Sequence, residues 1–168
     1  MKTLVLCRHA KSDWPAGVDD IRRPLKARGV RDATYLGGLL ARQTFVPDLI
    51  LSSPAVRALT TAQIIGKCLG YSEEVRQEAQ IYHGHDEHLI QLIRSLPAEK
   101  EIVMIFGHNP TMEAVAGKLL NCGTPVMMPT SAMICLESQA FSWSHTDSQH
   151  VYLRWMLVPR LMRKPGED

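Results

Sequence analysis

Three short apolar runs in this chain are each followed by polar residues and then by a stretch in which apolar residues recur at helical spacing. The runs cover residues 1–7, 49–51 and 101–106. The third run, EIVMIF, is almost continuously apolar, which is typical of a parallel strand covered on both faces. Alternation of such strands with helices predicts an α/β fold, a three-layer sandwich with helices on both faces of a mostly parallel central sheet.

The other elements follow from the same patterns. Helices are predicted over residues 25–43, 53–69, 89–96 and 109–120, and further strands over 132–136 and 151–157, whereas residues 71–85 are expected to be irregular. Ser53 before Pro54, and Asn109 before Pro110, are typical of a helix N-cap followed by proline at the first helical position. A chain of 168 residues suits one domain. We expect that domain to cover residues 1–160, with a frayed tail over 161–168.

Bulk properties exclude several classes of function. A net charge of +2 does not favour binding to nucleic acid or to a membrane, and no apolar stretch reaches the ~18 residues that span a bilayer. The N-terminus lacks the apolar segment of a secretory signal. The four cysteines form no C-x-x-C pair, so we expect reduced thiols and a cytoplasmic location. Cys7 could be a thiol nucleophile, but its side chain should point away from that of Arg8.

Polar groups follow three of the predicted strands: Arg8 and His9, then Ser53 with Arg57 one turn later, then His108. Ligands in α/β folds bind beyond the carboxyl ends of the strands, so these side chains should meet in one patch. Arginine forks and helix N-termini suit a phosphate group. A histidine there can attack phosphorus when its attacking nitrogen is unprotonated, and nearby arginines disfavour the imidazolium. Taken alone, a strand-end Arg-His pair is more often a solvated edge than a catalyst.

The sequence resembles a known family at these positions. Residues 6–10 (LCRHA), 52–58 (SSPAVRA) and 107–110 (GHNP) resemble the three motifs of the histidine phosphatase (phosphoglycerate-mutase-like) superfamily. Ala10 after the histidine, the short chain, RPL at 23–25 and PTSA at 129–132 resemble its short phosphohistidine phosphatase branch. The resemblance covers residues 3 to about 157 and implies the phosphoglycerate-mutase-like fold.

The resemblance also implies roles for individual residues. His9 would be the nucleophile that becomes phosphohistidine, and the phosphoryl group would be bound by Arg8, Arg57 and His108. Ser12 would lie in the phosphate pocket, Arg23 at its rim, and Ser131 with Thr130 in its lining, although Arg23 could be a plain surface residue and Thr130 and Ser131 a plain loop. No metal or other cofactor is implied. The substrate would be a phosphorylated protein or a small phosphate ester, and the product inorganic phosphate.

One departure from the family concerns the acid that protonates the leaving oxygen in many of its phosphomonoesterases and mutases. In the corresponding region only Glu78 is a possible acid, and it matches poorly. An alkoxide needs that proton, whereas a phosphorylated imidazole needs it less because its leaving nitrogen can already carry one. The sequence therefore favours a phosphohistidine protein phosphatase. The alternatives are a small-molecule phosphomonoesterase of the same family and a phospho-ligand binding module without turnover.

A second pattern lies in the same region. Residues 83–88 (HGHDEH) resemble the H-x-H-x-D-H zinc motif of metallo-β-lactamase-fold hydrolases, with glutamate in place of aspartate. Three close histidines could bind zinc. That fold needs further ligands downstream on a longer chain, so a solvated histidine-rich turn before the helix at Leu89 is the favoured interpretation.

Overall fold

One six-stranded sheet runs through the computed structural model, which describes residues 1–162. The strand order is β3-β2-β4-β1-β5-β6. Strands β3, β2, β4 and β1 are parallel neighbours. At the other edge β5 is antiparallel to both of its neighbours, β1 and β6. The bounds are β1 Lys2–Arg8, β2 Leu49–Ser52, β3 Arg76–Gln77, β4 Ile102–Gly107, β5 Met133–Ser138 and β6 Val151–Leu157. The predicted mostly parallel α/β sheet is confirmed.

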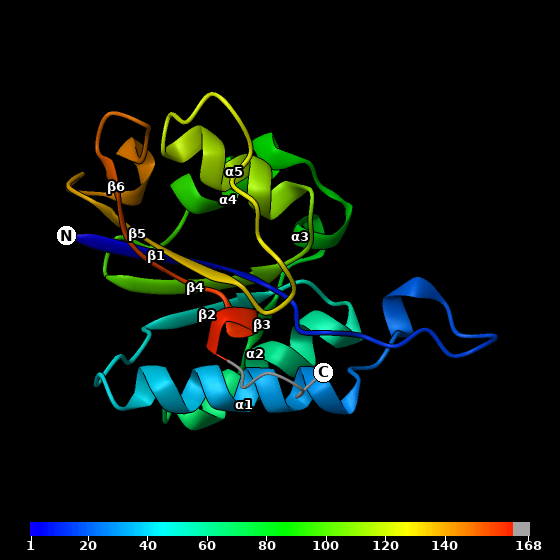
Figure 1. Ribbon diagram of the computed structural model, residues 1–168. Coiled ribbons are helices and arrows are strands. Elements are labelled where there is room, and N and C mark those ends of the chain that lie inside the picture. Colours follow the sequence, from blue (N-terminus) through cyan, green and yellow to red (C-terminus); the bar gives the residue numbers. More distant parts are fainter. Residues whose placement is uncertain (163–168) are drawn as a thin grey trace.

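Helices cover both faces of this sheet, as Figure 1 shows, with α1 and α2 on one face and α3, α4 and α5 on the other. The α-helices are α1 Ala27–Ala41, α2 Val56–Cys68, α3 Ala79–His83, α4 Asp86–Arg94 and α5 Thr111–Leu119, and the 3-10 helices are η1 Asp20–Arg22, η2 Trp143–His145 and η3 Pro159–Met162. Over the part of the chain that the structure describes, no helix combines the length and the apolar character needed to cross a bilayer.

Strand β1 shows how the sequence builds the two layers of core. Successive side chains of a strand point to opposite faces. Leu4 and Leu6 therefore pack with residues of α4 and α5, and Val5 and Cys7 with residues of α1 and α2. The thiol of Cys7 is fully buried, and burial raises its pKa well above the usual value. Cys7 is accordingly a core residue, because a reactive cysteine needs an accessible thiolate.

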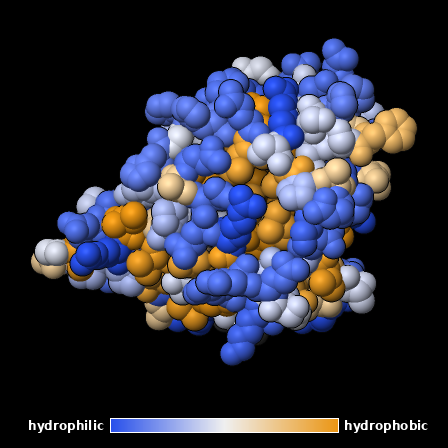
Figure 2. Space-filling model, turned by 180° about the vertical axis from the view of Figure 1, so that it is seen from behind, coloured by the Kyte–Doolittle hydropathy of each residue, from blue (hydrophilic) through white to orange (hydrophobic). Residues whose placement is uncertain are grey.

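The connection between β1 and α1 projects from the body of the molecule. It contains η1 and extends away from the sheet in Figure 1. In Figure 2, which is seen from behind, it extends to the left, and hydrophobic residues are visible there among more numerous hydrophilic ones. The connection returns to the body at α1, where the backbone N–H of Lys26 donates to the carbonyl of Lys11 at 2.9 Å. The polar residues of this connection therefore leave the body of the molecule and return to it at the same place.

Three predictions of local structure were wrong. The N-caps of α2 and α5 are Ala55 and Pro110, not Ser53 and Asn109. Ser53 Oγ accepts from the N–H of Ala55 in the turn before α2, whereas Asn109 Nδ2 donates to the carbonyl of Met128 in the loop after α5. Residues 71–85 contain β3 and α3, which are too short to give a recognisable periodicity. The predicted frayed tail lies mainly outside the described residues.

Candidate active site

The carboxyl ends of β1, β2 and β4 meet at one edge of the sheet. Arg8, the last residue of β1, is level with Gly107, the last of β4, and Ser52 ends β2 beside Phe106. A cavity of about 270 Å³ opens beyond these ends. Its lining combines the four predicted catalytic residues with others from the same loops: Arg8, His9, Lys11, Ser12, Arg23, Arg57, His108, Asn109 and Thr130. The structure therefore brings together residues that lie up to about 120 positions apart in the chain.

His9 is held directly after β1 with one ring nitrogen engaged. Its Nδ1 lies 2.7 Å from the carbonyl oxygen of Ala10, which can only accept, so Nδ1 carries the proton and Nε2 keeps its lone pair. The residue is 8% exposed. Burial lowers the pKa of His9 to about 4 against the raising effect of the hydrogen bond to Ala10, and the charges of Arg57 and Arg8 lower it further. The imidazole is thus neutral near pH 7, as a nucleophile must be.

His108 follows β4, and its ring centroid lies 5.1 Å from that of His9. Its Nε2 is 2.8 Å from Ser53 Oγ. Because that oxygen already accepts from the N–H of Ala55, its own proton can be donated to Nε2, which leaves the proton of His108 on Nδ1. Burial and then the charge of Arg57 lower the pKa of His108 to about 3. His108 is accordingly neutral, and in this tautomer its buried Nδ1–H, which has no partner among the described residues, can donate to a ligand.

Of the two predicted phosphate-binding arginines, Arg8 is anchored through one outer nitrogen of its guanidinium group and Arg57 through both. Arg8 Nη1 donates to the carbonyl of Met128 at 2.8 Å, and Arg57 Nη2 pairs with Asp20 Oδ2 at 2.9 Å. The Nε–H groups of both arginines are buried and have no hydrogen-bond partner within residues 1–162. Buried donors without partners are costly and rare, so their clustering beside two neutral histidines marks a site that an anionic ligand completes.

Asp20 and Tyr82 are parts of this site that the sequence analysis missed. Asp20 lies in η1, and its carboxylate contacts Arg57, Arg23 and the hydroxyl of Tyr82, which donates at 2.8 Å. These three hydrogen bonds hold the pKa of Asp20 at about 2, against the effect of its partial burial. Asp20 is one of two adjacent aspartates in a polar loop, and no local pattern distinguishes it.

The remaining predicted site residues fall in three places. Ser12 lies in the cavity wall, where its Oγ accepts from Arg23 Nη2 at 3.0 Å, and Arg23 also stacks on the ring of Trp14. Ser131 lies just behind the nucleophile, where its backbone N–H donates to the carbonyl of His9 at 3.1 Å, but it is not among the residues that line the cavity. Glu78 lies outside that lining too, and it pairs with Arg76 at 2.5 Å.

The histidine-rich stretch forms a helix start. His88 Nδ1 accepts from the backbone N–H of His85 at 3.1 Å, and the ring of His83 packs edge-on against Tyr82. Among residues 1–162 no group of three or more His, Cys, Asp or Glu side chains is arranged to hold a metal ion. His83 is the last residue of α3 and His88 lies in the first turn of α4, so the stretch joins two helices and is not a solvated turn alone.

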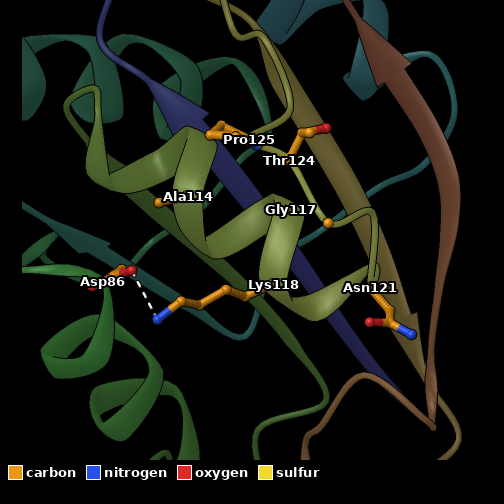
Figure 3. A pocket seen from close by; sticks show the side chains of 8 residues that line it. Asp86, Ala114, Gly117, Lys118, Asn121, Thr124 and Pro125 are labelled. Carbon is orange, nitrogen blue, oxygen red and sulfur yellow. Dashed lines mark ion pairs between the residues drawn. The ribbon is translucent and has the colours of Figure 1, made fainter.

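A larger hollow of about 450 Å³ lies against α5, away from the strand ends. Figure 3 shows Lys118 reaching across it to Asp86, whose Oδ2 is 2.9 Å from Lys118 Nζ. Lys118 also pairs with Glu87. The charged side chains that line this hollow, Asp86 and Lys118, are therefore paired with each other. The predicted catalytic residues line the smaller, basic cavity instead.

Comparison with known proteins agrees with this geometry. The model of the histidine phosphatase superfamily (branch 1) matches residues 4–82, which include Arg8, His9 and Arg57. The crystal structure of a proposed phosphohistidine phosphatase SixA from Agrobacterium tumefaciens is 31% identical, covers 94% of this chain and 98% of its own, and superimposes with a TM-score of 0.78. This chain belongs to the histidine phosphatase superfamily.

Within the superfamily it belongs to the short, SixA-like branch. An uncharacterised protein of Mycobacterium leprae is 32% identical over 165 residues, which cover 91% of this chain and 99% of that protein. The protein histidine phosphatase SixA in complex with tungstate has the same fold, with a TM-score of 0.83 at 21% identity over 96% of this chain and 99% of its own. The superfamily and branch to which the sequence was compared are confirmed.

Proposed function

We propose that this histidine phosphatase removes phosphoryl groups from phosphohistidine on proteins, by way of a phosphohistidine on its own His9. The observation that carries the proposal is the state of His9. Its Nδ1 is bound to the carbonyl of Ala10, and its low pKa keeps Nε2 unprotonated beside two arginines and a second histidine. A module that only binds phosphate has no need of a neutral imidazole held in one tautomer.

In the first step Nε2 of His9 attacks phosphorus. The new N–P bond forms as the P–N bond to the substrate imidazole breaks, and that imidazole leaves neutral because its other nitrogen carries a proton. Arg8, Arg57 and the Nδ1–H of His108 donate to the three phosphoryl oxygens, on which negative charge is spread in the transition state. The hydrogen bond to Ala10 holds the ring in place and stabilises the cationic imidazole of the phosphoenzyme.

In the second step water attacks the phosphorus of phosphohistidine. The N–P bond to His9 breaks, a P–O bond forms, and the proton lost by water ends on the phosphate product or in solvent. His9 returns to the neutral state in which it started. The same donors bind the phosphoryl oxygens in both steps, so one cavity serves both transfers.

The lining of the cavity supports a phosphohistidine substrate over an ester. No carboxyl side chain lines it, and Glu78 is paired with Arg76. An alkoxide leaving group would lack a nearby proton donor, whereas an imidazole leaves without one. The same lining supports a reaction without metal, because it carries four cationic side chains and no carboxylate, which is a poor set of ligands for a metal ion.

The test compares turnover of a histidine-phosphorylated phosphotransfer protein with turnover of sugar and aryl phosphates. We expect the highest kcat/KM on the phosphoprotein. A higher kcat/KM on a sugar phosphate would assign the protein to the small-molecule phosphomonoesterases of the family. If inorganic phosphate protects the protein against melting but no substrate is turned over, the protein is a binding module and the proposal is wrong.

A further inference from the structure

Asp20 stands out as the one carboxylate in direct contact with the arginines of the cavity, among the described residues. It comes from η1, in the projecting connection between β1 and α1, whereas Arg57 comes from α2 and Tyr82 from α3. Its Oδ2 lies 2.9 Å from Arg57 Nη2 and 2.8 Å from the hydroxyl of Tyr82. Its Oδ1 lies 3.0 Å from Arg23 Nη1. One side chain therefore joins the projecting connection to two helices on opposite faces of the sheet.

Asp20 binds Arg57 through both its backbone and its side chain. The backbone carbonyl of Asp20 accepts from Nη1 at 2.6 Å while its carboxylate accepts from Nη2, so both outer nitrogens of the guanidinium group are bound to one residue. Arg57 is 5% exposed, and its Nε–H has no partner among the described residues. A planar fork held at both outer nitrogens cannot rotate. Its remaining donors are then oriented before any ligand arrives.

Arg23 is held in the same way at the rim. Its three nitrogens donate to Asp20 Oδ1, to Ser12 Oγ and to the backbone carbonyl of Asp13, and its guanidinium group lies 4.2 Å from the centre of the Trp14 ring. Arg23 and Arg57 both line the cavity and repel each other. A shared carboxylate between them offsets that repulsion and keeps both in place when the cavity is empty.

We propose that Asp20 is a positioning residue, which orients Arg57 for the transition state of phosphoryl transfer and does not itself contact the phosphoryl group. This inference rests on the proposed function, since it assigns the way in which that same cavity is prepared for catalysis. Donors that are oriented in advance accelerate a reaction because no reorganisation is needed as charge develops. Asp20 is not among the residues that line the cavity, which agrees with an indirect role.

The decisive variant is Asp20→Asn, which keeps the shape of the side chain but places an amide N–H₂ against donors of Arg57 or Arg23. We expect kcat for phosphoprotein hydrolysis to fall about 10- to 100-fold, because misplacement of a catalytic group by about 1 Å can cost that much. The inhibition constant for inorganic phosphate should change by less than about threefold, since removing a negative charge near the cavity favours anion binding and compensates for lost orientation. Asp20→Glu should recover part of kcat.

The matched control is Asp19→Asn. It makes the same change of charge at the neighbouring position, where the side chain is exposed and does not cap η1, so kcat should stay within about twofold of the parent. Tyr82→Phe removes one of the three contacts to the carboxylate and should cost less than Asp20→Asn. Unchanged kcat in Asp20→Asn, no recovery in Asp20→Glu, or a phosphate inhibition constant that rises in proportion to the loss of kcat would overturn the inference.

A second measurement does not depend on turnover. Nitrogen NMR of the Arg57 guanidinium group reports rotation about its Nε–Cζ bond, which should be hindered in the parent protein and in Asp19→Asn and fast in Asp20→Asn. Equal rotation in all three would contradict the positioning role. Absence of turnover in the parent protein with hindered rotation of Arg57 would instead refute the proposed function and leave the role of Asp20 as an orienting residue intact.

Discussion

Lowering the pH should separate the buried active-site histidines from ordinary surface histidines. The pKa of His9 is about 4 in the folded protein, mainly because of burial, against a usual value of 6.5. At about pH 5 a histidine with a pKa of about 4 is ~90% neutral, whereas one with a pKa of about 6.5 is only ~3% neutral. The rate of phosphoenzyme formation should therefore remain near its plateau at pH 5 and fall only below about pH 4.5.

The same pKa shift makes the free energy of unfolding depend on pH. The unfolded chain binds a proton at position 9 near pH 6.5, whereas the folded protein does not bind it until about pH 4. The contribution of neutral His9 to the free energy of unfolding is therefore fully present above pH 6.5 and is lost as the pH falls towards 4. Between about pH 7.5 and about pH 5 this linkage amounts to roughly 2 kcal/mol for His9 alone. His108, with a pKa of about 3, should add a loss of the same sign.

The assay is urea unfolding of the parent protein and of His9→Gln at both pH values. Most carboxylates stay ionised over this window, so the histidines dominate the change. The loss of stability in His9→Gln should be smaller than in the parent by about 2 kcal/mol. If His9→Gln and the parent protein lose the same amount, or if phosphoenzyme formation titrates near pH 6.5, the reasoning about the buried nucleophile is wrong.

Two further predictions concern packing and metal. A Cβ at Gly29 would overlap the backbone carbonyl of the cavity residue Lys11, so Gly29→Ala should lower the free energy of unfolding by about 1–3 kcal/mol and reduce turnover. At Gly38, on the same helix, a Cβ meets nothing within 4 Å. Gly38→Ala should therefore raise the free energy of unfolding by about 0.5–1 kcal/mol and leave activity unchanged. Prolonged treatment with EDTA should leave kcat unchanged, because the cavity lining offers no carboxylate to a metal; a loss of activity that is restored by zinc or magnesium would contradict metal independence.

The strands and the four central residues could be predicted because each depends on a short local pattern. Continuous apolar runs identify buried strands, and the rule that ligands bind at the carboxyl ends of parallel strands predicts that Arg8, Arg57 and His108 meet His9. Helix starts were predicted less well. Ser53 and Asn109 have the side chains of N-caps, but Ser53 accepts a hydrogen bond in the preceding turn and Asn109 donates to Met128, which lies 19 positions further along the chain. A local motif cannot show which of several acceptors a polar side chain finally meets.

Asp20 and Tyr82 could not be predicted for a different reason. Their contact spans 62 residues and joins a polar connection to a five-residue helix, two segments without recognisable periodicity. The same holds for Glu78, whose pairing with Arg76 depends on the two-residue strand β3. Sequence patterns indicate which residues can perform the chemistry, whereas the residues that orient them become apparent only when the loops are placed.

Covalent capture of phosphate on His9 tests the central claim most directly. The protein would be mixed briefly with a histidine-phosphorylated protein carrying ³²P, quenched in alkali, digested and analysed by mass spectrometry. The account predicts an acid-labile phosphoryl group on the peptide that contains His9, and no label in His9→Ala, which should also lack turnover. A label on another residue, or full turnover in His9→Ala, would contradict it.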